Sequence, residues 1–294
     1  MSGGLRPLFI LGEKMSRDRL LSYGTIGEPR KGEGGRHIVA LSGGVASAWV
    51  GHWARTYIGK GVVYYFNDTK WEHPDLYRFL SDFEGALDVD IIKDNDGRNP
   101  EQVFYDNKML GSDRAPICSK FLKAKKMQDF VLPGDKVYFG IGIHELQRAS
   151  RIAPIYERLG VEAKFPMIEN PVLKHKPFEL CQDLGIEIPQ MYKDGFEHNN
   201  CYGGCVRAGA KQWLSMLRTY PDVFADRERI EREFTDWNNA RRLKEDPKYR
   251  PRDYHFMKDM GLKELREIEE QGIDFDFGPD EWQGECVGIC GRMF

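Results

Sequence analysis

An apolar run followed at once by a glycine-rich loop constrains this chain more than any other feature. Residues 38–41 read Ile-Val-Ala-Leu, and the segment Ser42-Gly43-Gly44-Val45-Ala46-Ser47 follows directly. This order predicts a buried strand, a sharp turn whose glycines let the backbone approach an anion, and a helix that starts near Ala46. The unpaired N–H groups of that helix and the Ser42 and Ser47 hydroxyls would face the same anion. The loop has neither the Gly-Lys-Ser/Thr ending of a Walker motif nor the Gly-x-Gly-x-x-Gly pattern.

The pattern around this loop predicts an α/β fold with a doubly wound, mainly parallel sheet. Strand-like runs occur at 38–41, 61–66, 89–92 and 136–143, with amphipathic segments between them. After about Phe165 the strand-like runs stop, and helical patterns occur at 177–184, 210–218, 226–243 and 263–271. We expect an irregular lead-in over 1–36 with a short helix at 16–23, a nucleotide-binding domain over 37–165, and a helical C-terminal region over 166–294. The charged, proline-broken segment 246–253 is interpreted as a solvated connector.

Composition predicts a soluble, cytoplasmic protein. The net charge of −3 gives no global positive field that would draw the molecule onto nucleic acid, although local basic patches are compatible with it. No apolar run approaches the roughly 18–20 residues that span a bilayer. Four of the six cysteines form two Cys-x-x-x-Cys pairs, which favours a cytosolic metal site over a disulfide framework.

The glycine loop resembles that of the PP-loop superfamily, the ATP pyrophosphatases and the phosphoadenosine-phosphosulfate (PAPS) reductases, whose pattern is Ser-Gly-Gly-x-Asp-Ser. Ala46 stands where the family has Asp, an acid associated there with loop order and with metal-bound phosphates. Three further segments resemble the PAPS-reductase-like group. They are Asn67-Asp-Thr-Lys-Trp-Glu-His-Pro-Asp-Leu-Tyr77, Cys118-Ser-Lys-Phe-Leu-Lys123, and the Glu145-x-x-Arg148 segment after the run 137–143. The four matches follow the family's order over about 37–151.

The resemblance implies binding of ATP or a related adenine nucleotide, with Mg as a further candidate. The implied nucleotide contacts are Leu41, Ser42, Gly43, Gly44, Ala46, Ser47, Phe66, Asp68, Glu145, Arg148 and Arg151. Backbone at Phe66 would read the adenine edge, with Asp68 near the sugar or a metal. Glu72 would lie with Asp68 near the sugar or metal. The alternative interpretation of Glu72 and Asp75 is that they are first-turn charges that favour the helix dipole and have no ligand role.

The implied catalytic residues are Cys118, Lys120, Lys123 and Arg148. The two lysines would lie one helical turn apart and face a phosphate or sulfate together. Basic neighbours would favour the thiolate form of Cys118. A semi-buried structural cysteine is the alternative for Cys118, and a salt-bridged surface helix start is the alternative for Arg148.

The two cysteine pairs, Cys201/Cys205 and Cys286/Cys290, supply four thiolates. That number suits tetrahedral zinc or an iron–sulfur cluster equally, and the spacing does not separate them. The segment 170–205 resembles PAPS-reductase-like proteins with a Cys-rich site, including ones implicated in sulfur transfer to nucleic acid. By that resemblance we favour a [4Fe–4S] cluster over zinc, with unligated thiols third. His198 is a substitute ligand, a hydrogen-bond donor to a ligand, or solvated, and Cys181 is a small core residue.

Three functions compete. The first is an ATP-dependent PP-loop sulfurtransferase that carries out adenylation-linked sulfur transfer, with nucleic acid as acceptor and a sulfur-donor protein as a further candidate partner. The second is a PAPS or APS reductase. The C-terminal Glu-Cys-Gly-Leu-His tail of that enzyme is not found, although residues 284–290 are loosely similar to it. The third is a non-catalytic nucleotide-binding subunit with a structural zinc, which Ala46 favours. The sequence indicates no oligomeric state and no membrane partner.

Overall fold

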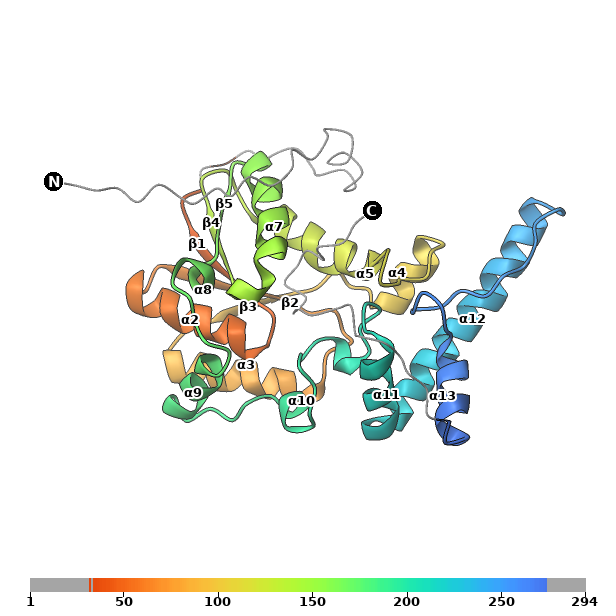
Figure 1. The fold of residues 1–294 in the computed structure, drawn as a ribbon. Coiled ribbons are helices and arrows are strands. Elements are labelled where there is room, and N and C mark those ends of the chain that lie inside the picture. The colour runs from red at the N-terminus through yellow and green to blue at the C-terminus, as the bar shows by residue number, and fades with distance from the viewer. Residues whose placement is uncertain (1–31, 33, 274–294) are drawn as a thin grey trace.

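A five-stranded, all-parallel sheet organises the computed structural model, which describes residues 32 and 34–273. The strand order is β3-β2-β1-β4-β5 (Figure 1). The strands are β1 (His37–Leu41), β2 (Val62–Asn67), β3 (Ile91–Asp94), β4 (Lys136–Phe139) and β5 (Glu162–Lys164). The chain winds outward from β1 to β2 and β3, then crosses to β4 on the other side of β1. The order therefore reverses between β1 and β4.

Helices cover both faces of this sheet because the side chains of each strand alternate between the two faces. Val39 and Leu41 face one layer, which includes α2 (Val45–Tyr57), α3 (Pro74–Leu87) and α9 (Lys176–Asp183). Ile38 and Ala40 face the other layer, which includes α6 (Lys126–Phe130) and α7 (Leu146–Arg158). The expected doubly wound α/β fold is confirmed.

A third core lies beside the sheet and is mainly helical. Trp213 and Phe256 stack at its centre, with ring centroids 5.7 Å apart, and both are fully buried. Its main helices are α4 (Pro100–Asp106), α11 (Ala210–Thr219), α12 (Pro221–Glu245) and α13 (Leu262–Glu270). The remaining elements are α5 (Ile117–Ser119), the π-helical η1 (Lys120–Lys125), η2 (Ile143–Glu145), α8 (Pro166–Glu169), α10 (Gln190–Lys193) and η3 (Cys201–Gly203).

Two strand predictions differ from the structure. The fourth strand ends at Phe139, because the chain turns through Gly140 and Gly142 and residues 143–145 form a 3₁₀ turn. The three-residue edge strand β5 was not predicted, since Glu-Ala-Lys has no apolar run. The helix expected at 16–23 lies outside the described residues. None of the described helices is long and apolar enough to cross a membrane.

Candidate functional site

The glycine loop lies where the strand order reverses, at the carboxyl ends of β1 and β4. In open α/β sheets this crevice is where ligands bind. Gly43 has φ +80°, a conformation that favours glycine, and a Cβ there would lie 2.5 Å from a methyl carbon of Leu76. A Cβ on Gly140, after β4, would lie 2.7 Å from the backbone of Ser47. Two glycines thus allow the two strand ends to approach the start of α2.

Hydrogen bonds within the loop hold its shape. The Ser47 hydroxyl donates to the Gly44 carbonyl at 2.8 Å and accepts from the Ser42 backbone N–H at 3.1 Å. No side chain caps the N-terminus of α2, and its first turn has no acidic residue. A helix start without a capping side chain or acid is suited to an anion. Ser47 therefore orders the loop in which Ala46 replaces the family's Asp.

The end of β2 places Asp68 as the sequence predicted, near the sheet edge. Its carboxylate Oδ1 accepts from the Tyr77 hydroxyl at 2.9 Å and from the Lys70 N–H at 2.7 Å. Burial, followed by the Asp68 carboxylate, raises the pKa of Tyr77, so the phenol stays protonated. The Phe66 side chain lies in the core, which leaves only its backbone for a ligand.

Glu145 and Arg148 form a largely buried ion pair after β4. Arg148 Nη1 lies 2.6 Å from Glu145 Oε1, and the side chains are 11% and 7% exposed. A salt-bridged surface helix start is therefore the wrong interpretation of Arg148. Its Nη2 atom is buried and has no hydrogen-bond partner within 34–273, so one guanidinium edge could serve an acceptor. Arg151, one turn later, is half-buried.

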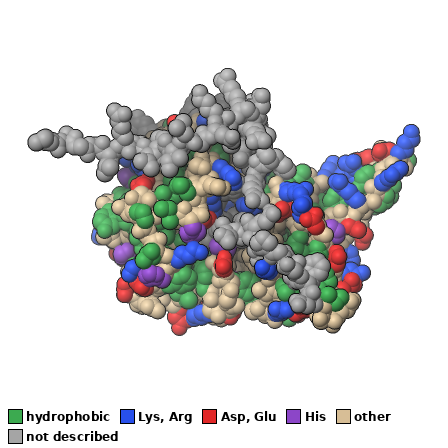
Figure 2. Space-filling view, viewed as in Figure 1, with side chains coloured by type: hydrophobic (Ala, Val, Ile, Leu, Met, Phe, Trp, Pro, Cys, Tyr) green, Lys and Arg blue, Asp and Glu red, His purple; other side chains and the backbone are tan. Residues whose placement is uncertain are grey.

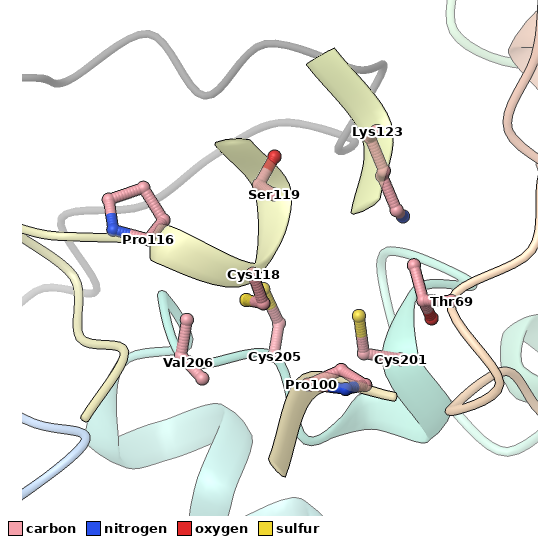
Figure 3. A pocket seen from close by; sticks show the side chains of 9 residues that line it. All are labelled: Thr69, Pro100, Pro116, Cys118, Ser119, Lys123, Cys201, Cys205 and Val206. Atoms are coloured by element: carbon pink, nitrogen blue, oxygen red, sulfur yellow. The ribbon is translucent and has the colours of Figure 1, made fainter. Parts of the chain in front are cut away.

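Three thiols line one pocket next to this edge (Figure 3). Cys118 comes from α5, whereas Cys201 and Cys205 flank the η3 turn. Cys201 and Tyr202 have φ +49° and +54°, an unusual pair of left-handed residues that tightens this turn. The other lining residues are Thr69, Pro100, Pro116, Ser119, Lys123 and Val206. We call this the thiol pocket.

The thiol pocket is buried, and the charged groups Glu72 and Lys123 affect the pKa of Cys201 within it. A hydrogen bond with the Cys205 thiol, then burial and the Glu72 carboxylate, raise the pKa of Cys201 well above its usual value, while Lys123 lowers it. Lys123 itself is buried. Cys181 lies in the core beside α2, where burial raises its pKa to about 11, as expected for a core cysteine.

The structure thus places Cys118 beside Cys201 and Cys205, a proximity that the sequence did not predict. Cys286 and Cys290 lie outside the described residues. Over the described range, 32 and 34–273, no group of three or more His, Cys, Asp or Glu side chains is arranged to hold a metal ion. The two lysines differ in position: Lys123 lines the thiol pocket, whereas the Lys120 ammonium lies 5.5 Å from the Phe121 ring centre.

Glu72 makes more contacts in the site than the sequence analysis predicted. It precedes α3, whose N-cap is His73, so it is not a first-turn charge of that helix. Its Oε2 accepts from the Cys201 N–H at 2.8 Å, and its Oε1 accepts from the Thr69 hydroxyl at 2.8 Å. Lys123 Nζ lies 3.5 Å from Oε1. The signal was available, because Glu72 occupies a Glu position of the family pattern.

Asn199 makes a second connection between the cysteine segment and the glycine loop. Its Nδ2 donates to the Gly43 carbonyl at 3.0 Å, and the bond is buried. His198 is largely buried in the same segment, and burial lowers its pKa to about 4 despite the nearby Glu145. His198 is therefore neutral at neutral pH and is not a solvated loop residue.

Comparison with known proteins agrees with this geometry. The phosphoadenosine phosphosulfate reductase domain family matches residues 36–202, more than half of the chain. The chain belongs to this family, a family of PP-loop, nucleotide-binding enzymes. No curated protein matches the chain. The matched range ends at Tyr202, so Cys205 and the helices α11–α13 lie beyond it.

Proposed function

We propose that this protein binds ATP or a related adenylyl nucleotide at the β1–β4 edge and carries out adenylation-linked sulfur transfer with the thiols of the thiol pocket. One observation carries the proposal. Three thiols from two distant segments meet beside the buried Lys123, and Glu72 and Asn199 connect one of those segments to the nucleotide edge. Sulfur chemistry and nucleotide binding would then share one rigid site.

The nucleotide would be held by groups of known position. The uncapped start of α2 and the loop amides would bind phosphate oxygens, and the free Nη2 of Arg148 would add a charged donor. Lys123 would stabilise negative charge that develops on the side of the thiol pocket. A Mg ion on the phosphates would find its carboxylate in Asp68.

Two pocket thiols are sufficient to transfer one sulfur atom to the acceptor. An acceptor oxygen attacks the α-phosphorus of ATP, and pyrophosphate leaves. A persulfide sulfur on one pocket cysteine, supplied by a sulfur-donor protein, then displaces AMP from the adenylated acceptor. A second pocket thiol attacks the mixed disulfide, releases the thiolated acceptor and forms a Cys–Cys disulfide, which an external dithiol reduces.

The proposed [4Fe–4S] cluster would use the same thiols. The donor chemistry of Cys201 and Cys205 fits iron or zinc, and the other two thiolates of a four-thiolate site would come from Cys286 and Cys290. A cluster would supply electron-transfer or Lewis-acid chemistry. Cluster ligation and persulfide transfer compete for these thiols, so metal analysis of anaerobically purified protein separates them. Stoichiometric zinc without iron would instead support the non-catalytic subunit with a structural site.

The reductase reading rests on the family's named activity. Incubation with PAPS or APS and a dithiol reductant tests it, because a reductase releases sulfite and the corresponding adenosine phosphate. Sulfite release without any ATP-dependent reaction would replace sulfur transfer with reduction as the function of this site.

Nucleotide binding is tested by Gly44→Asp with Gly44→Asn as the matched control. Gly44 has extended backbone (φ −97°) at the N-cap of α2, where Asp and Asn are both favoured capping residues. Both variants should fold, but the carboxylate should repel phosphate. We expect ATP affinity, measured by calorimetry, to fall roughly tenfold or more for Asp and clearly less for Asn. Equal ATP binding by the wild type and Gly44→Asp would contradict the proposed site.

A further inference from the structure

The C-terminal half of α12 projects from the body of the molecule, and the chain returns along it (Figure 1). We call residues 235–254 the basic arm. The sequence predicts a solvated connector over 246–253, and these residues are mostly exposed, while hydrogen bonds also attach the return segment to the helix. Asn239 donates to the Arg252 carbonyl at 2.9 Å and accepts from the Tyr249 hydroxyl at 3.1 Å. Thr235 accepts from the Tyr254 N–H at 3.1 Å. These hydrogen bonds therefore fix the return segment against the helix.

Positive charge is concentrated on the arm. The arm contains six Lys and Arg and four acidic residues, a net charge of +2 in a chain whose net charge is −3, and its tip at 241–252 has a net charge of +4. Figure 2 shows Lys and Arg side chains along this projection. Of the six, only Arg241 forms an ion pair, with Glu245 at 2.8 Å, among the described residues. The five without one are Arg242, Lys244, Lys248, Arg250 and Arg252, and all are exposed.

Several arginines elsewhere in the described chain are paired twice. Arg78 pairs with Asp75 and Asp82, and Arg266 pairs with Glu228 and Glu270. Such pairs neutralise surface charge within the protein. Unpaired cations gathered on one projection leave their charge available to an external anion.

Tyrosine rings hold two of the arm's guanidinium groups in place. Arg242 lies 4.9 Å from the Tyr249 ring centre, and Arg252 lies 4.8 Å from the Tyr254 ring centre. The two tyrosine hydroxyls are 2.9 Å apart. A guanidinium held against a ring loses less side-chain entropy when it binds phosphate oxygens.

We propose that the basic arm binds the phosphate backbone of a nucleic acid. This inference rests on the sulfur transfer proposed above, and it makes a nucleic acid the acceptor of the sulfur. A membrane surface is the less suitable partner, because Leu243 is the only exposed large hydrophobic side chain over 235–254. Basic residues interleaved with aromatic residues on one projecting element are the electrostatic footprint of nucleic-acid binding.

The arm is connected to the site by a single helix. Arg227, near the start of α12, is buried and lies 3.6 Å from the ring centre of Trp71, next to Glu72. From Arg227 to Arg242 the helix rises about 22 Å, since each residue adds about 1.5 Å. That length corresponds to about six nucleotide steps of roughly 3.4 Å. A strand held on the arm is within reach of the thiol pocket.

The test uses the full chain with the double variant Lys248→Glu/Arg250→Glu and the control Lys60→Glu/Lys174→Glu. The control residues are equally exposed, form no ion pair among the described residues, and change the net charge by the same amount. Binding of a 20-nucleotide strand and a 20-base-pair duplex is measured by fluorescence anisotropy over a salt series. We expect the arm variant to bind roughly tenfold or more weakly, with the duplex salt slope reduced by about 2, and the control to bind like the wild type.

Three results would overturn the inference: no nucleic-acid binding by the wild type, equal loss in the control, or arm-dependent binding to phosphatidylserine vesicles but not to nucleic acid. ATP binding measured on the same proteins separates this inference from the proposed function. Normal ATP binding with no arm-dependent nucleic-acid binding would overturn only the arm. Failure of the wild type to bind ATP would contradict the nucleotide site and leave the arm measurement valid.

Discussion

Two buried glutamates each accept backbone N–H groups, one in the candidate site and one in the helical region. They differ in the basic side chain that lies beside them. Glu72 accepts the Cys201 N–H in the site, and Glu231 accepts the Phe256 and Leu262 N–H groups, at 2.7 Å each, in the helical region. Both are buried. Glu72 lies 3.5 Å from the buried Lys123, whereas Glu231 lies 3.6 Å from the imidazole ring of His255. The contact between Glu231 and His255 therefore depends on pH near neutrality, because Glu231 raises the pKa of His255 above its ordinary value.

Removing the carboxylate of Glu72 should have the largest effect on stability. Glu72→Ala removes the carboxylate beside the buried Lys123 and the acceptor of the Cys201 N–H. Breaking a buried pair by removing one partner costs about 3–5 kcal/mol. We expect a loss of that size in the free energy of unfolding, measured by urea denaturation at pH 7.

Glu231→Ala is the matched variant for that measurement. It removes the acceptor of two backbone hydrogen bonds, which costs about 1–3 kcal/mol where a donor is left buried. The partly exposed His255 ring can then be solvated in place of its contact with Glu231. Glu231→Ala should therefore cost less than Glu72→Ala. An equal or reversed order would show that the buried lysine is not what distinguishes the two regions.

Local sequence pattern predicted the strand, the glycine loop and the helix start at the carboxyl end of β1, because these parts are close together in the chain. The strand, the glycine loop and the start of α2 all lie within residues 37–57, and the order of elements followed from apolar runs. The thiol pocket could not be predicted in this way. Cys118 and Cys201 are more than 80 residues apart, and they line one pocket only in the folded chain. Spacing within the chain instead suggested that the two Cys-x-x-x-Cys pairs belong together.

Burial of His198 predicts a sensitivity of the site region to acid. Its pKa is about 4 when folded and near 6.5 when unfolded, so between these values the unfolded chain binds more protons. Stability should then fall as the pH drops from 6.5 to 4, by about 3 kcal/mol for this group. His198→Asn should remove that part of the pH dependence in urea titrations. An unchanged profile in His198→Asn would show that His198 titrates near its ordinary value in the folded protein.

His255 should give the smallest effect, with the opposite sign. The Glu231 carboxylate, which outweighs desolvation and is supported by Asp253 and Glu264, raises the pKa of His255 above 6.5. The folded protein therefore holds this proton more tightly than the unfolded chain does. The resulting stabilisation is fully present below pH 6.5 and is lost as the pH rises through the folded pKa. Because the ring is about one-third exposed, solvent screens the pair and the change should be small. His255→Asn should flatten the stability profile above pH 6.5 and leave the acid limb of His198 intact, and a change in the acid limb instead would show that the two regions do not titrate independently.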